Sequence, residues 1–356
     1  MSETRACINA IGCAVPDQDV HRSFIDWATG QLTDDRARTL FARMAERSGI
    51  DHRWSVLPVT AEGGSPVDPG GFYAEGMPTT SRRMALYQRF APALALRAID
   101  KLRARTPIDG ITHLVVASCT GFVAPGVDQI ISDALGLAGV ERTLVGFMGC
   151  YAAVAALRTA RHIVRSEPTA RVLVVTVELS SLHLQVEQQV ERLLMMLQFG
   201  DGAAAALVSA DASGFAIDTP FALQLPDSAD LIRWDIGDTG FLMQLSGEVP
   251  GRIQSALKDG AVRHRLCGDM PPESVRNWAV HAGGRSILDA VEHGLDLDER
   301  ALDASRAVLA RNGNMSSATL MFILADLLDR ERRGQGVALA FGPGLAAEGF
   351  RFARAG

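Results

Sequence analysis

The chain has 356 residues, of which 47% are hydrophobic and 21% are charged, and its formal net charge is −6. This length exceeds what one small core accommodates, so it predicts two domains or one large α/β domain. The acidic balance provides no basic surface for nucleic acid or an anionic membrane, which excludes these two classes of partner from the prediction.

The N-terminal segment, residues 1–16, lacks a basic region followed by a long apolar core, so it does not resemble a secretory signal. No apolar run reaches the roughly 18–20 residues that a membrane span needs. The five cysteines are widely spread and form neither a disulfide framework nor a CxxC metal pair. These features predict a reduced, cytoplasmic protein without a metal site.

Helical and loop patterns occupy the next part of the chain. Residues 34–50 have the apolar spacing of a helix, and residues 81–106 form a long amphipathic pattern that stops at Pro107. Between them, residues 62–80 are rich in Gly, Pro, Ser and Thr, which predicts an ordered loop or a lid.

Strand and helix patterns then alternate. Three apolar runs, residues 112–119, 142–148 and 170–179, predict strands, and residues 127–137 and 150–166 predict the helices between them. Because these runs do not alternate with polar residues, we expect strands covered on both faces, hence a parallel sheet with helices on each side.

The same alternation continues in the second half of the chain. The predicted strands, two of them with their following loops, are residues 199–210, 214–225, 276–284 and 336–344; the predicted helices are residues 283–295 and 316–333. Two halves rich in βα patterns suggest an internal duplication with a boundary near residues 210–220.

Cys150 stands where a predicted strand gives way to a predicted helix. Unpaired N–H groups and the helix dipole favour negative charge in the first turn of a helix, which predicts a thiol with a lowered pKa and greater nucleophilicity. The alternative is a buried cysteine that fills space, and this segment alone does not decide between the two.

Three further residues are candidates to act with this thiol. His281 follows an apolar strand and precedes two glycines, which allow a ligand or another backbone to approach closely. His183, after the predicted strand 170–179, is the second candidate base. Asn314 precedes a helix, so it is either a helix cap or an amide that donates to a carbonyl oxygen gaining negative charge.

Five segments together resemble a known family. GFMGCYAAV (146–154), FGDGAAA (199–205), WAVHAGGRSIL (278–288), GNMSSAT (313–319) and FGPG (341–344), in this order and spacing, resemble the type III polyketide synthases, the chalcone synthase-like family. The resemblance covers the chain from about residue 35 to its end and is closer to the bacterial members.

The resemblance implies a fold. The expected architecture is an α/β thiolase fold in which two duplicated βα halves form five αβαβα layers, working as a homodimer. Residues 1–215 would form the N-terminal half, which carries the nucleophilic cysteine, and residues 216–356 the C-terminal half, which carries the histidine and the asparagine.

The resemblance also implies site residues. Cys150, His281 and Asn314 match the catalytic triad, and Phe199 matches a gatekeeper at the cavity mouth. The other expected substrate-binding residues are Cys119, His183, Trp234, Met243, Ser316, Phe341, Gly342, Pro343 and Gly344. Arg43 and Arg47 match two basic positions near the coenzyme A phosphates, although a solvated helix face is the alternative interpretation.

Four cavity positions depart from the plant members. Met243 replaces a second gatekeeper phenylalanine, Trp234 a glycine, His183 a small polar residue and Cys119 a threonine. Because bulky Trp234 and His183 would shrink or redirect the cavity, the resemblance does not carry over the identity of the product.

The implied reaction is an iterative decarboxylative condensation of malonyl-CoA onto an acyl-CoA starter held as a thioester on Cys150, followed by cyclisation to a pyrone, resorcinol or similar aromatic product. The substrates are coenzyme A thioesters, and no metal or redox cofactor is expected.

Three alternative functions remain: a ketoacyl synthase III-type condensing enzyme, a papain-like protease and a degenerate non-enzymatic subunit. His-Ala-Gly-Gly in place of His-Gln-Ala-Asn disfavours the first, and the strand before Cys150 disfavours the second.

Overall fold

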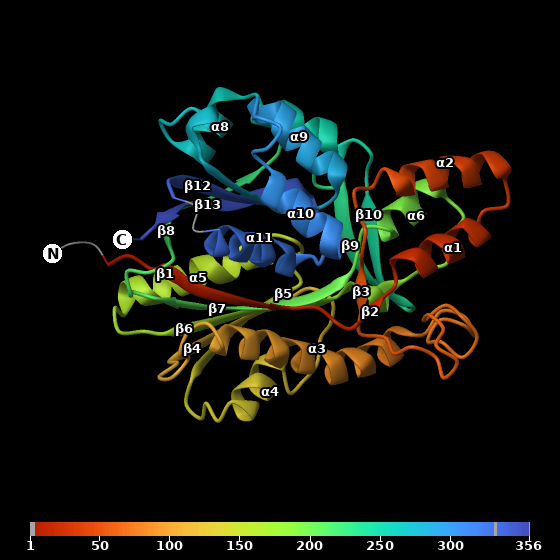
Figure 1. The fold of residues 1–356 in the computed structure, drawn as a ribbon, viewed down its shortest axis with the longest axis horizontal. Helices are drawn as coiled ribbons and strands as arrows, with labels where there is room; N and C mark the ends of the chain where they lie inside the picture. The colour runs from red at the N-terminus through yellow and green to blue at the C-terminus, as the bar shows by residue number, and fades with distance from the viewer. Residues whose placement is uncertain (1–3, 331–332, 356) are drawn as a thin grey trace.

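The computed structural model describes residues 4–330 and 333–355. Residues 1–3 of the N-terminal segment, residues 331–332 of the predicted helix 316–333 and residue 356 lie outside the described part. Figure 1 shows helices and strands in layers, with two sheet layers, one helix layer between them and further helices on each outer side. The five αβαβα layers that the resemblance implied are present.

One hydrogen-bonded strand order runs through both sheet layers. The order is β11-β12-β13-β8-β1-β7-β6-β4-β5. The N-terminal layer contains β1 (Cys7–Ala14), β7 (Asp201–Ser209), β6 (Val172–Leu179), β4 (His113–Ser118) and β5 (Glu141–Gly146). The C-terminal layer contains β8 (Phe215–Gln224), β13 (Ala346–Arg354), β12 (Gln335–Gly342) and β11 (Asn277–Val280). The layers are joined where β1 pairs with β8, at only two residue pairs, Cys7 with Ala216 and Ile8 with Phe215.

The sheet is mixed, so the prediction of a parallel sheet was only partly right. β4 pairs in parallel with β5 and β6, and β11 pairs in parallel with β12. The pairs β1–β7, β6–β7, β12–β13 and β8–β13 are antiparallel. An unbroken apolar run records burial on both faces of a strand, but it does not record the direction of its neighbours.

Two helices fill the central layer. They are α5 (Ala152–Ser166) and α11 (Ser317–Asp329), and both pack within one apolar cluster that includes side chains from the two sheet layers. α11 is buried around nearly its whole circumference, as expected for a helix that is apolar on all sides. α5 contributes mainly alanines to this cluster, which allows the sheets to approach it closely.

Other helices cover the outer faces. α3 (Thr80–Arg103) and α4 (Val127–Ala134) cover the N-terminal layer. α7 (Val249–Leu257), α8 (Gly260–Cys267) and α9 (Arg285–Leu295) cover the C-terminal layer, and α10 (Asp303–Asn312) packs beside α11. The labels of α3, α4, α8, α9, α10 and α11 in Figure 1 agree with these positions.

A smaller group of elements lies at one end of the molecule, on the right in Figure 1. It contains α1 (His21–Gln31), α2 (Asp35–Glu46) and α6 (Val190–Met196), which share an apolar cluster around Phe24 and Phe41. The short strands β2 (Gln18–Asp19) and β3 (Trp54–Ser55) pair nearby, and a hairpin of β9 (Ile232–Gly237) and β10 (Gly240–Leu245) stands beside them. Short 3₁₀ turns cover residues 180–183, 272–274 and 343–345.

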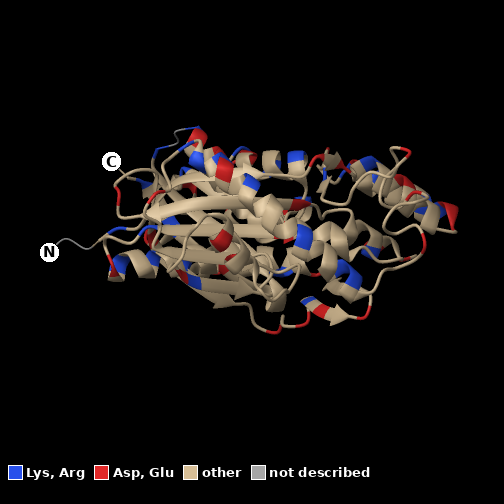
Figure 2. Ribbon diagram, turned by 90° about the horizontal axis from the view of Figure 1, so that it is seen from below, with Lys and Arg blue, Asp and Glu red and all other residues tan. Residues whose placement is uncertain are grey.

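Charged side chains lie mainly on helices and loops. In Figure 2 basic and acidic residues are interspersed there, while most strands carry few of either. In the described part of the chain, no helix is both long enough and apolar enough to cross a membrane.

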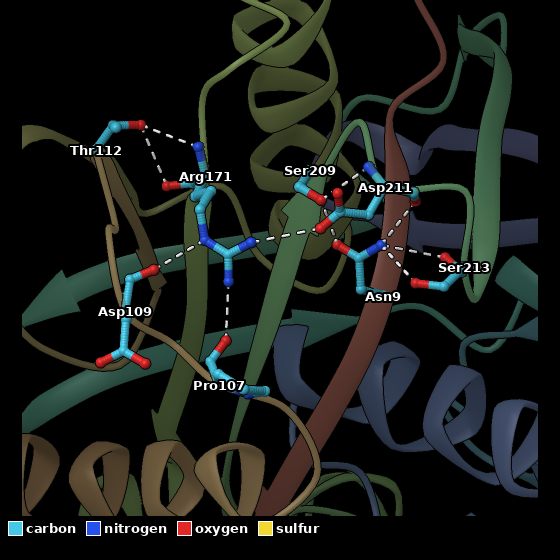
Figure 3. A network of polar contacts seen from close by, with 8 residues as sticks. All are labelled: Asn9, Pro107, Asp109, Thr112, Arg171, Ser209, Asp211 and Ser213. Carbon is cyan, nitrogen blue, oxygen red and sulfur yellow. Dashed lines mark hydrogen bonds and ion pairs between the residues drawn. The ribbon is translucent and has the colours of Figure 1, made fainter.

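A polar network fixes the end of the sheet where β6 begins (Figure 3). The Arg171 guanidinium donates to the carbonyl oxygens of Pro107 and Asp109, each at 2.9 Å, and pairs with Asp211 at 3.4 Å. Asn9 of β1 donates to backbone oxygens of Asp211 and Ser213. Arg171 precedes β6, so the network lies at the opposite end of this strand from the 3₁₀ turn of residues 180–183.

Candidate active site

Three predicted catalytic residues converge from separate elements. Cys150 lies two residues before the start of α5, His281 directly follows β11, and Asn314 lies three residues before α11. All three line one cavity of about 60 Å³. The convergence therefore unites groups contributed by both halves of the chain.

Asn314 is held between two loops. A β-bridge joins it to Phe199, with the Asn314 N–H donating to the Gln198 oxygen at 2.7 Å. Its side-chain oxygen accepts from the Ser316 N–H at 2.8 Å, and its side-chain nitrogen donates to the Gly283 oxygen at 3.2 Å. The bond to Ser316 is the local role expected of a turn residue, while the bond to Gly283 fixes the amide beside the loop that carries His281.

The predicted lowering of the Cys150 pKa is wrong. Cys150 precedes the N-cap residue of α5 instead of occupying its first turn. Burial raises the pKa of the thiol to about 12, although hydrogen bonds from the Ser316 and Asn314 side chains act in the lowering direction. The Ser316 hydroxyl lies 3.9 Å from the Cys150 sulfur.

The imidazole of His281 lines the cavity. Its side chain is 1% exposed, and within the described residues neither ring nitrogen has a hydrogen-bond partner. Burial lowers its pKa to about 3, so the ring is neutral. Buried polar atoms normally have hydrogen-bond partners. Two ring nitrogens without a partner in a cavity therefore indicate that the imidazole can bond to a ligand or accept a proton.

Most of the predicted substrate-binding residues line the same cavity. They are Cys119, Phe199, Trp234, Met243, Ser316, Phe341, Gly342 and Pro343. Gly344 lies next to this wall without lining it, and His183 lines a neighbouring chamber instead. Arg43 and Arg47 are exposed on α2 and its C-cap and do not line either space.

Gly149 lets the loop of residues 341–344 approach Cys150. It has a φ of +79°, and a Cβ at this position would lie 2.3 Å from Cδ of Pro343. Both the backbone conformation and the contact therefore require glycine. Cys119 supports the same turn, because the Gly149 N–H donates to its sulfur at 3.0 Å. Burial raises the Cys119 pKa well above its ordinary value. The Cys119 thiol also donates to the Gly149 oxygen at 3.2 Å, so both bonds of the sulfur are to the turn before Cys150.

Glu178, near the end of β6, is a buried residue of the site that was not predicted from the sequence. Its fully buried carboxyl accepts from the Cys119 N–H and the Thr120 hydroxyl, each at 2.9 Å, and from the Ser317 hydroxyl. Burial raises its pKa to about 7. A lone acidic residue in a strand of valines was the signal that could have identified it.

Arg53 was also missed. It is 3% exposed and donates from Nη1 to the Phe199 oxygen at 2.8 Å and to the Met196 oxygen at 3.2 Å. Its guanidinium also lies 4.5 Å from the centre of the Phe24 ring. Arg53 therefore holds the backbone of Phe199, and through the β-bridge that of Asn314. No local pattern distinguishes it from a surface arginine.

Comparisons with known proteins identify the family. Residues 1–212 match the family model "Chalcone and stilbene synthases, N-terminal domain", and residues 218–354 match the corresponding C-terminal domain. The chain is 32% identical to the alpha-pyrone synthesis polyketide synthase-like Pks18 of Mycobacterium tuberculosis, covering 98% of this chain and 91% of the relative. It is 30% identical to type III polyketide synthase A of Arabidopsis thaliana, covering 97% and 92%.

Solved structures give the same result. The C-terminal type III polyketide synthase domain of Steely1, a type I/III hybrid from Dictyostelium, superposes with a TM-score of 0.88 at 26% identity, covering 99% of this chain and 100% of that domain. The family and the fold implied by the five motifs are thus confirmed. The chain belongs to the chalcone and stilbene synthase family and is a type III polyketide synthase, an acyltransferase with the thiolase fold.

Proposed function

We propose that this enzyme condenses malonyl-CoA iteratively onto an acyl-CoA starter held on Cys150 and releases a pyrone, a resorcinol or a similar cyclic product. The observation that carries the proposal is the convergence of Cys150, His281 and Asn314 on one cavity. The name of the mycobacterial relative, an α-pyrone synthesis enzyme, favours a pyrone among these products.

Loading of the starter requires a proton transfer within the site. A single charge on the thiol or on the imidazole is disfavoured by burial, but moving the proton from Cys150 to His281 creates two opposite charges whose attraction offsets part of that cost. The thiolate attacks the carbonyl carbon of the acyl-CoA and the carbon–sulfur bond to coenzyme A breaks. Coenzyme A leaves as a thiol with the proton from His281.

Extension begins when malonyl-CoA loses carbon dioxide. The electron pair of the broken carbon–carbon bond forms an enolate, whose charge develops on the thioester oxygen. The Asn314 amide and the His281 ring are the donors proposed to stabilise that oxygen. One Asn314 N–H already donates to the Gly283 oxygen, which fixes the amide while its second N–H is available to the substrate.

The enolate carbon then attacks the thioester carbonyl on Cys150. A carbon–carbon bond forms, the carbon–sulfur bond to Cys150 breaks, and the thiolate is restored. The product is a coenzyme A thioester longer by two carbons, which reloads Cys150 for the next round. No step oxidises or reduces the substrate, so we propose that no redox cofactor is required. Because Asn314 and His281 are proposed to stabilise the enolate oxygen, we propose that no metal is required either, and we expect activity to survive treatment with a chelator.

Arg43 and Arg47 are proposed to contact the coenzyme A phosphates. They are exposed and four residues apart, which places them on one face of the chain at the end of α2. Arg285 donates from its guanidinium to the Arg47 backbone oxygen at 3.2 Å and adds a third cation to this region. Reversing the charge at both positions should raise the KM for malonyl-CoA more than it lowers kcat.

We also propose a homodimer. β5 is an edge strand, paired on one side with β4, and its Leu144 is 50% exposed. Nearby Phe122 is 43% exposed. An apolar edge strand is usually covered in the functional assembly. The molar mass measured by light scattering tests the proposed homodimer.

A reduced, cytoplasmic location is proposed because the nucleophile and the other four cysteines are free thiols.

The decisive test is incubation with malonyl-CoA and a panel of acyl-CoA starters, with products identified by mass. We expect condensation without an acyl carrier protein, and none from Cys150→Ala. An absolute requirement for malonyl-acyl carrier protein would instead favour the ketoacyl synthase III-type reaction. Condensation by Cys150→Ala equal to that of the wild type would refute the assigned nucleophile.

A further inference from the structure

One wall of the reaction cavity is a hairpin that is separate from the main sheet. Among the described strands, β9 and β10 pair only with each other. Four of their residues line the cavity of Cys150, namely Ile232 and Trp234 from β9 and, directly opposite them on β10, Leu245 and Met243. Since no other described strand restrains the hairpin, the position of this wall depends on contacts made elsewhere along it.

Packing alone does not hold the hairpin in place. Ile236 is 57% exposed and Leu242 is 39% exposed. The open end of the hairpin is closed by the Ser246 N–H, which donates to the Leu231 oxygen at 2.9 Å. A two-stranded hairpin is at best marginally stable by itself in water. A restraint at the turn, between the two strands, is therefore needed to fix the wall.

Thr80, the first residue of α3, binds this turn. Its backbone N–H donates to the Asp238 oxygen at 2.7 Å, and its hydroxyl donates to the Gly237 oxygen. The same hydroxyl accepts from the Gly240 N–H at 2.8 Å. Gly237 ends β9 and Gly240 begins β10, so one hydroxyl bonds to both strands of the hairpin.

Two further side chains bind the rest of the turn. Gln185 donates from Nε2 to the Thr239 oxygen at 2.8 Å and accepts at Oε1 from the Thr239 hydroxyl at 3.3 Å. His183 accepts at Nδ1 from the Phe241 N–H at 3.0 Å. Every residue from 237 to 241 is thus bonded to one of three residues outside the hairpin.

Arg83 connects these contacts to the same helix. It is fully buried, lies one turn after Thr80 on α3, and donates to the Leu182 oxygen at 2.6 Å and the Leu184 oxygen at 2.9 Å. Leaving a buried guanidinium without acceptors would be costly, so this segment is firmly attached to α3. The start of α3 therefore positions the hairpin both directly and through residues 182–185.

We propose that Thr80 is a positioning residue that limits the number of extensions, because its hydroxyl fixes the hairpin wall against the growing chain on Cys150. Each round adds two carbons and one oxygen to a chain held in a cavity of about 60 Å³. Close-packed walls do not yield without cost, so a wall fixed at its turn stops the next extension earlier than a loose one. Thr80 does not line the cavity and acts through the hairpin. This inference rests on the proposed condensing activity.

The growing chain has two competing fates after each round. It either accepts another two-carbon unit or is released. In a release that forms a pyrone, an enol oxygen of the chain attacks the thioester carbonyl, a carbon–oxygen bond forms, the carbon–sulfur bond breaks and the sulfur takes the enol proton. The ratio of the two rates depends on the difference between their barriers, so a small displacement of the wall changes the products.

The first experiment removes the hydroxyl with little change of shape. Thr80→Val is incubated with malonyl-CoA and hexanoyl-CoA, and the products are identified by mass. We expect the ratio of products with additional two-carbon units to the main wild-type product to rise roughly threefold or more, since two hydrogen bonds to the turn are lost. Thr80→Ser keeps the hydroxyl and should give the wild-type ratio. A smaller rise in Thr80→Val, a shift to shorter products, or an equal rise in Thr80→Ser overturns the proposal.

Thr79→Val is the matched control. Thr79 is the N-cap residue of α3, and its hydroxyl accepts from the Arg82 N–H at 3.3 Å but makes no bond to the hairpin among the described residues. This variant should be less stable than the wild type and give the wild-type product ratio. A rise equal to that of Thr80→Val would assign the effect to the helix start and overturn the role of the Thr80 hydroxyl. If Thr80→Val does not fold, Gln185→Met makes the same test with the same threshold, because it removes both bonds to Thr239.

Hydrogen–deuterium exchange of the free enzyme separates this inference from the proposed reaction, because it requires no turnover. We expect peptides covering residues 232–245 to exchange roughly fivefold faster in Thr80→Val than in the wild type, and at the wild-type rate in Thr79→Val. Faster exchange without condensation on any starter would refute the reaction and keep the contact that fixes the hairpin. Unchanged exchange would refute that contact. Faster exchange together with condensation to unchanged products would refute its role in the number of extensions.

Discussion

Replacing Glu178 with glutamine should remove a pH-dependent loss of stability. In the folded protein, burial raises the pKa of this carboxyl from its ordinary value of 4.5 to about 7. Below pH 4.5 it is protonated in both the folded and the unfolded chain, so its contribution to stability is fully present. Between pH 4.5 and about 7 the unfolded chain releases the proton while the folded chain keeps it, so the free energy of unfolding falls. Above that range the folded carboxyl ionises too, and the loss stops growing.

The size of this loss follows from the separation of the two pKa values. At 1.36 kcal/mol per pH unit it amounts to about 3 kcal/mol between pH 4 and pH 8. Glutamine is a suitable replacement because its oxygen can accept from the Cys119 N–H and the Thr120 hydroxyl, as one carboxyl oxygen of Glu178 does now. Its NH₂ group can donate to the Ser317 hydroxyl, which at present donates to the other carboxyl oxygen.

Urea unfolding followed by tryptophan fluorescence provides the assay. The wild type and Glu178→Gln are compared at each pH, so that titrations elsewhere cancel in the difference. We expect the glutamine variant to gain stability relative to the wild type as the pH rises from 4 to 8. A difference that stays constant over this range, or one that shrinks with rising pH, would refute the argument that burial governs this carboxyl.

Substitutions at three other positions test the geometry. Gly149→Ala should lower kcat/KM at least tenfold, because its Cβ displaces Pro343 and its φ is unfavourable; wild-type kinetics would contradict this. Arg53→Met should lower kcat/KM roughly tenfold, because it removes the donor to the Phe199 oxygen. Arg53→Lys should cause a smaller loss, because its ammonium group can still donate to that oxygen. Equal losses in the two variants would count against this role of Arg53. Arg171→Ala should lower the free energy of unfolding by about 1–2 kcal/mol while kcat/KM stays within twofold, and a kinetic loss as large as that of Arg53→Met would show that the site is not insulated from that network.

The sequence predicted the elements that carry continuous apolar patterns. The predicted helices 34–50 and 81–106 correspond to Asp35–Glu46 and Thr80–Arg103, and the predicted strand 170–179 to Val172–Leu179. The predicted strand 142–148 is present as Glu141–Gly146, but it is an exposed edge strand instead of a buried one. An apolar pattern predicts burial, and it agrees as well with burial by a second copy of the chain as with burial inside one chain.

Other elements were missed because their patterns are weak. The β9–β10 hairpin, residues 232–245, mixes charged and apolar residues on a half-exposed surface. The last strand, Ala346–Arg354, directly follows the segment predicted as residues 336–344. Its first residues, Ala346–Gly349, give no strand signal, and the alternating Phe350 and Phe352 alone are too short a pattern to predict it.

The three residues predicted to be catalytic line one cavity, but their electrostatics were not predictable from the sequence. Cys150, His281 and Asn314 are marked by the strand and helix ends at which they stand. The direction of the Cys150 pKa was missed because local sequence shows a helix start but does not show burial. Glu178 and Arg53 act through bonds to Ser317 and Phe199, 139 and 146 positions away, and no local pattern records such contacts.

The central helix layer has a consequence for how the protein could be divided. α11 belongs to the second half of the chain, yet it packs against β1, β6 and β7 of the first. A polypeptide cut between residues 215 and 216 would give two fragments, each lacking one helix of the shared interior and part of the cavity. Neither fragment alone would hold a thiol, an imidazole and a carboxamide together, so recovered turnover on mixing them would report directly on their reassembly.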